Sequence, residues 1–87
     1  MTDLTGRRIL VTGGQGALGS AIVARLSGLG ATVVSNDVVE PPASSGLYVR
    51  GDAAVPGVAS EILDAVADLA GGLADTLCLN AGMAISK

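Results

Sequence analysis

The sequence lacks histidine, phenylalanine and tryptophan, and Tyr48 is its only aromatic residue. It has one cysteine, Cys78, and five basic residues against eight acidic ones. A single cysteine excludes a disulfide framework and a cysteine metal cluster, and without histidine nothing activates its thiol, so we expect Cys78 to be a small buried hydrophobic residue. The basic residues are scattered and form no stripe that could follow a phosphate backbone, so we expect no nucleic-acid partner.

Long hydrophobic runs are also missing, although 49% of the 87 residues are apolar. The N-terminal apolar stretch is too short and too interrupted by glycine for a signal sequence or a membrane span. We therefore expect a cytoplasmic protein without a membrane partner. The length suits one small domain or part of a larger one, and we treat residues 1–87 as the N-terminal part of a single domain.

Short apolar runs rich in β-branched residues alternate with helix-like stripes along the chain. Runs at residues 9–12, 32–35, 47–50 and 76–79 predict four strands. Because helices separate most of these runs, the pattern predicts an α/β fold: a partial, Rossmann-type parallel sheet in strand order 3-2-1-4, with helices on both faces.

Two helices are predicted from apolar residues at steps of three and four. The first spans roughly residues 16–29 and ends at Gly30, where a glycine cap is expected. The second has Pro56 in its first turn and ends at residues 71–72. Its expected apolar stripe consists of Val55, Ala59, Ile62, Val66 and Leu69.

Four glycines within seven positions separate the first strand from the first helix. A turn of this kind at the carboxyl edge of a parallel sheet is where dinucleotide pyrophosphates bind. Gly13 suits the positive φ of a tight turn, Gly16 removes a side chain from the path of the phosphate, and Gly19 allows close helix packing. The alternative is a glycine-rich turn that only connects two elements.

Asp37 ends the second predicted strand, eighteen residues after Gly19. A carboxylate there can accept hydrogen bonds from the ribose hydroxyls of NAD and repels the 2′-phosphate of NADP. No Arg or Lys is expected nearby and Val38 follows directly, so NAD is preferred over NADP. The alternatives are an Asp that only begins a loop and a site for S-adenosylmethionine. A P-loop is excluded because Ser20 stands where its lysine is required.

Three motifs resemble those of the short-chain dehydrogenase/reductase family. The segment TGGQGALG at residues 12–19 is similar to its cofactor loop, GD at 51–52 to its adenine-contacting acid, and NAG at 80–82 to the motif that closes its fourth strand. The three motifs occur in the family's order and cover almost the whole chain. One departure is Ala17, which stands where the simple branch has a glycine, whereas Gly16 matches the extended branch.

The resemblance assigns roles to individual residues. Asp52 would accept a hydrogen bond from the adenine amino group beside the N–H of Ala53, although a turn or cap acid is the alternative for Asp52. Asn80 would stabilise the central strands, while Ala81 and Gly82 would let the ribose lie against the backbone. The expected cofactor-binding residues are Gly13, Gln15, Gly16, Ala17, Leu18, Gly19, Asp37, Asp52, Ala53, Asn80, Ala81 and Gly82.

The resemblance also implies an NAD-dependent oxidoreductase that moves hydride between NAD(H) and an alcohol or ketone substrate. The family's catalytic Ser, Tyr and Lys lie beyond the NAG motif, and Tyr48 has Asp52 four positions on where a lysine is required. We therefore expect a truncated NAD-binding portion, inactive alone, whose parent could form homo-oligomers. The alternatives are a non-enzymatic nucleotide-binding or interaction module and a fragment without function.

Overall fold

The computed structural model describes residues 3–40 and 46–79. Its elements are β1 (Arg8–Thr12), α1 (Ala17–Gly28), β2 (Thr32–Asp37), β3 (Tyr48–Arg50), α2 (Val58–Ala70) and β4 (Thr76–Leu79). The strands form one sheet in the order β3-β2-β1-β4, and every neighbouring pair is parallel. The predicted α/β fold and strand order are therefore confirmed, as a partial Rossmann-like fold.

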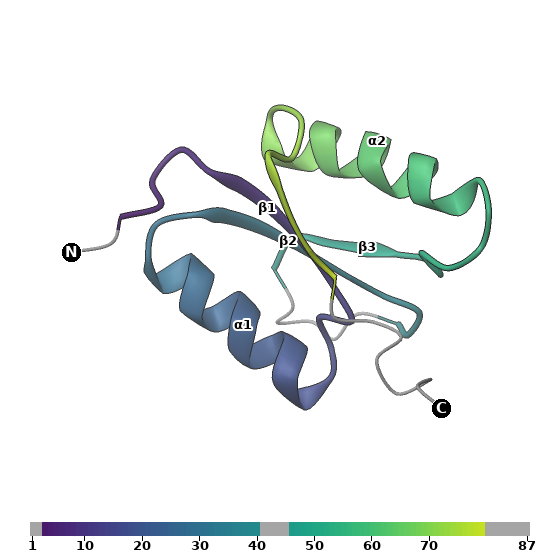
Figure 1. The fold of residues 1–87 in the computed structure, drawn as a ribbon, viewed down its shortest axis with the longest axis horizontal. Helices are drawn as coiled ribbons and strands as arrows, with labels where there is room; N and C mark the ends of the chain where they lie inside the picture. Colours follow the sequence, from purple (N-terminus) through teal and green to yellow (C-terminus); the bar gives the residue numbers. More distant parts are fainter. Residues whose placement is uncertain (1–2, 41–45, 80–87) are drawn as a thin grey trace.

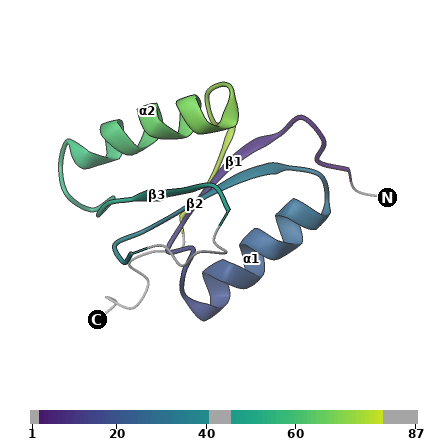
Figure 2. The same cartoon turned by 180° about the vertical axis from the view of Figure 1, so that it is seen from behind.

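The two helices cover opposite faces of this sheet (Figures 1 and 2). On one face, Leu10 and Val34 pack with Ile62 and Val66 of α2. On the other face, a cluster of Ile9, Val11 and Val33 is covered by Ile22, Val23 and Leu26 of α1. Because adjacent side chains of a strand point to opposite faces, the continuous β-branched runs of β1 and β2 supply both cores.

Glycines end both helices. Gly30, with a φ of 99°, donates to the carbonyl of Ser27, and Ala31 donates to that of Leu26, which together form a Schellman motif after α1. Gly71, with a φ of 80°, caps α2. The predicted glycine cap at Gly30 and the predicted end of the second helix at residues 71–72 are thus confirmed, and α1 itself ends at Gly28.

The expected apolar stripe of α2 is only partly right. Ile62 and Val66 are buried, but Val55 and Leu69 are each 44% exposed, and Val58 and Ala70 take their places against the sheet. The helix begins at Val58, after Gly57 at a φ of 88°, so Val55 and Pro56 precede it.

The outer side of β4 carries no further strand within residues 3–40 and 46–79. Leu77 and Leu79 of this strand are 50% and 71% exposed. Neither helix in the described part of the chain is long and apolar enough to cross a bilayer.

Candidate functional site

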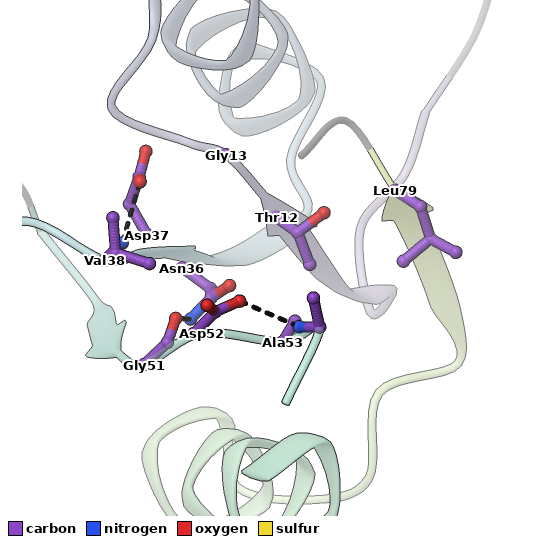
Figure 3. A pocket seen from close by; sticks show the side chains of 10 residues that line it. Thr12, Gly13, Asn36, Asp37, Val38, Gly51, Asp52, Ala53 and Leu79 are labelled. Carbon is purple, nitrogen blue, oxygen red and sulfur yellow. Dashed lines mark hydrogen bonds between the residues drawn. The ribbon is translucent and has the colours of Figure 1, made fainter. Parts of the chain in front are cut away.

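The carboxyl ends of the strands surround a cavity of about 580 Å³ (Figure 3). The chain passes from β1 outward to β2 and β3 and then returns to place β4 on the other side of β1, so this edge includes the topological switch point where open α/β sheets bind ligands. The cavity lies within the size range of small-molecule sites. Its lining residues are Thr12, Gly13, Asn36, Asp37, Val38, Gly51, Asp52, Ala53, Ala54 and Leu79.

The glycine loop between β1 and α1 folds tightly against the end of β2. Gly13 has a φ of 69°, as its predicted role requires. The N–H of Gly14 donates to the carbonyl of Asn36 over 2.9 Å. A Cβ on Gly14 would lie only 2.5 Å from the Cβ of Ser35, so this glycine is needed for the close approach of loop and strand. No local pattern in the sequence predicts this role for Gly14.

Asp37 joins this loop to the end of β2. Its Oδ2 accepts a hydrogen bond of 3.0 Å from the N–H of Gln15, and its Oδ1 accepts one of 2.8 Å from the N–H of Val38. Each carboxylate oxygen has two lone pairs, so both keep capacity for a further donor. Asp37 is therefore held in place by one N–H of its own loop and one of the glycine loop, while it lines the cavity.

Asn36 fixes the end of β3 beside the cavity. Its side chain is buried, and its amide donates to the carbonyl of Val49 over 2.9 Å and to that of Gly51 over 3.1 Å. The amide thereby continues the β2–β3 pairing past the last strand residue, Arg50. This contact positions the backbone that carries Asp52.

Asp52 shapes the turn that follows β3. Its Oδ1 accepts a hydrogen bond of 3.0 Å from the N–H of Ala54, which is a local Asx-type contact. It does not cap α2, because the cap residue is Gly57. The alternative role as a turn acid is thus correct, and the exposed carboxylate still lines the cavity beside Ala53.

The remaining expected cofactor residues lie at the start of α1 or outside the described part of the chain. Gly16 is the N-cap residue, Ala17 and Leu18 are exposed in the first turn, and Gly19 is buried. The first turn of α1 carries no acidic side chain, and Gly16 supplies no side-chain cap, so neither opposes an anion at this helix end. The residues 80–82 lie outside the described residues, as do any contacts they make.

The expectation that no basic side chain lies near Asp37 is wrong. The parallel register of β2 and β3 pairs Asp37 with Arg50, whose side chain lies on the same face. Its Nε donates to the carbonyl of Val38 over 3.0 Å, and its Nη1 forms an ion pair of 2.9 Å with Oε1 of Glu40.

Tyr48, like Arg50, contacts the segment that follows Asp37, and it does not line the cavity. Its hydroxyl donates to the carbonyl of Val39 over 2.7 Å. Removal of the ring from water, and secondarily the negative charge of Asp37, raise the pKa of Tyr48 above its ordinary value of 10.0. The phenol is thus a protonated donor at neutral pH, unlike a tyrosine prepared for acid–base catalysis.

The roles of Gly14, Asn36 and Arg50 were not predicted from the sequence, because each depends on contacts with a neighbouring strand. Val38 was noted there for its place directly after Asp37, and it lines the cavity. In the described part of the chain, no three His, Cys, Asp or Glu side chains come together as metal ligands.

No protein-family model matches this sequence, and no curated protein or solved structure is significantly similar to it. The class of protein therefore follows from the fold and the cavity: a parallel α/β sheet with a polar-edged site at its carboxyl end.

Proposed function

We propose that this chain binds the adenosine diphosphate half of NAD and is the NAD-binding part of an oxidoreductase similar to short-chain dehydrogenases/reductases. One observation carries the proposal: Gly13, Asp37, Asp52 and Ala53, singled out at three separate places in the sequence, line one cavity at the carboxyl edge of the sheet. Neighbouring parallel strands share one carboxyl edge in any case, so the support lies in the chemistry of that edge: a bare glycine turn and two carboxylates line one cavity there.

The cavity and the glycine loop suit different parts of the nucleotide. Asp37 supplies carboxylate oxygens for ribose hydroxyls, and Asp52 supplies one for the exocyclic amine of adenine. Val38 offers an apolar wall that is 52% exposed. The N-terminus of α1 offers backbone N–H groups and the positive end of a helix dipole to the pyrophosphate.

The proposed enzyme of which this chain is the NAD-binding part transfers hydride between NAD(H) and an alcohol or ketone. The proposal also includes a cytoplasmic location and assembly into homo-oligomers. The second candidate is a nucleotide-binding module without catalysis. It is favoured by the cavity lining, which among the described residues contains no Tyr, Lys, Ser, His or Cys.

Isothermal titration calorimetry on the 87-residue chain tests the proposal. We expect NAD to bind at least about tenfold more tightly than NADP, because one carboxylate facing a phosphate at close range costs about 1–4 kcal/mol. ADP should compete with NAD, since both carry the same half. Absence of NAD and ADP binding would refute the function, whereas equal affinity for NAD and NADP would remove the role of Asp37.

The two candidate functions differ in turnover. Oxidation of NADH with a panel of ketones, catalysed by this chain or by a longer form of it, would support the oxidoreductase. The reaction is followed at the absorbance of the reduced nicotinamide. Nucleotide binding without turnover, by this chain and by any longer form of it, would favour the module.

A further inference from the structure

Two side chains of β3 hold the segment that follows Asp37. Tyr48 and Arg50 lie two positions apart and therefore on one face of the strand, the face that also carries Asp37. They donate to the consecutive carbonyls of Val39 and Val38. The backbone beside the proposed ribose site is thus fixed from a neighbouring strand.

Arg50 places a positive charge next to this segment. Its guanidinium uses Nε for the carbonyl of Val38, a cavity residue, and Nη1 for Glu40. Arginine is the side chain best suited to bind a phosphate, because its five N–H groups form a planar fork. In sites where an arginine lies near the adenosine ribose, the 2′-phosphate of NADP is accommodated.

Glu40 opposes that use of Arg50. Its side chain is 78% exposed, that of Arg50 is 55% exposed, and the two form an ion pair of 2.9 Å. The pair occupies one edge of the guanidinium and cancels its charge. Glu40 also adds a second negative charge to that of Asp37 on this side of the ribose, and a 2′-phosphate brings about −1.5 to −2 more.

We infer that Glu40 is a specificity-determining residue that, by pairing with Arg50, makes the site select a dinucleotide with a free 2′-hydroxyl over one with a 2′-phosphate. This inference rests on the proposed NAD site. According to this inference, Asp37 does not act alone: Glu40, three positions further on, and Arg50 of β3 together set how strongly NADP is rejected.

The test is the Glu40→Gln variant, titrated with NAD and with NADP. The amide keeps the length of the side chain and an oxygen for Arg50, but it loses the charge. We expect affinity for NADP to rise about tenfold, the size of effect that one charge produces at close range, while affinity for NAD changes by less than about twofold.

Two control variants separate this effect from general changes. Asp68→Asn removes the same charge from the exposed face of α2, near the helix end away from the cavity, and should leave the NAD/NADP ratio unchanged. Tyr48→Phe removes the neighbouring hydrogen bond to Val39 without changing charge, so it should affect both nucleotides alike.

The double variant Glu40→Gln, Arg50→Gln identifies the group responsible. If Arg50 binds the 2′-phosphate once Glu40 is neutral, the gain in NADP affinity must disappear in the double variant. Thermal melts check folding, and because both side chains are largely exposed we expect unfolding temperatures close to that of the parent chain.

The outcomes are distinct. If the unsubstituted 87-residue chain binds neither NAD nor ADP, the proposed function is overturned and this inference with it. If the unsubstituted chain binds NAD, either of two results overturns this inference alone. One is an NADP affinity that Glu40→Gln leaves unchanged, and the other is an NADP affinity that stays raised in the double variant.

Discussion

Gly14 and Gly16 lie two residues apart in the same turn, but their surroundings differ. A Cβ on Gly14 would overlap Ser35, which is itself buried. A Cβ on Gly16 would meet only the carbonyl oxygen of Gly13, at an ordinary 3.7 Å. The first glycine is therefore required by the fold, and the second is available for a ligand.

This difference predicts opposite phenotypes. Gly14→Ala should lower the free energy of unfolding by about 1–3 kcal/mol, as overpacked sites do. Gly16→Val should cost less than about 1 kcal/mol, the scale of an unfavourable N-cap residue, but weaken NAD binding at least about tenfold by placing a branched side chain against the pyrophosphate. Urea unfolding and calorimetry measure the two effects. If Gly16→Val lowered the free energy of unfolding as much as Gly14→Ala does, Gly16 would be a folding residue.

At the residue scale, the sequence predicts a role when the role depends on neighbours in the chain, and it does not when the role depends on residues far away in the chain. Gly13 and Asp37 are found because a turn or a strand end is a local pattern. The roles of Asn36 and Arg50 depend on backbone groups twelve or more residues away, brought together by the register of β2 and β3. No local pattern encodes that register.

At the scale of elements, the spacing of the apolar residues and the glycines and prolines between them together predicted the strands, the helices and their order. Glycines at 30 and 71 gave the helix ends because only a positive φ completes those caps. The stripe of α2 was misplaced because apolar residues line more than one possible face of this helix. The sheet decides between these faces: Leu10 and Val34 receive Val58, Ile62, Val66 and Ala70 together.

The start of β4 depends on Asp75. Its Oδ2 accepts a bond of 3.1 Å from the N–H of Arg8, and its Oδ1 accepts one of 2.9 Å from the hydroxyl of Thr76. The bond from Arg8, then that from Thr76, lower the pKa of Asp75 below its ordinary value of 3.8. Ionised Asp75 therefore stabilises the junction of β1 and β4.

This predicts a pH dependence. Because the pKa is lower in the folded chain, the stabilisation is fully present above pH 3.8 and is lost as the pH falls below it, through the folded-state pKa. Asp75→Asn should be slightly less stable than the parent chain at neutral pH, and the difference should close in acid. Melting temperatures of both proteins between about pH 2 and pH 7 measure it. A difference that stays constant over this range would contradict the role of the charge.

At the scale of the whole molecule, the sheet is asymmetric. Both faces of β1 and β2 are covered, but within residues 3–40 and 46–79 the outer edge of β4 is unpaired, next to a small apolar cavity of about 240 Å³. Leu63, Leu77 and Leu79 line this cavity and are at least 39% exposed. Unpaired edge backbone beside exposed leucine is a surface on which another chain can add a strand.

We therefore expect the 87-residue chain to self-associate through β4 as its concentration rises. Leu77→Lys puts a charge on the edge strand and should shift the chain towards monomer, because a lysine opposes pairing at an edge. Leu73→Lys is the matched control: Leu73 is 72% exposed but precedes the strand, so its loss should leave association unchanged. Sedimentation velocity over a concentration series distinguishes the two. An equal effect of both variants would point to unspecific hydrophobic contact, and a parent chain that stays monomeric throughout would show that this edge is not used.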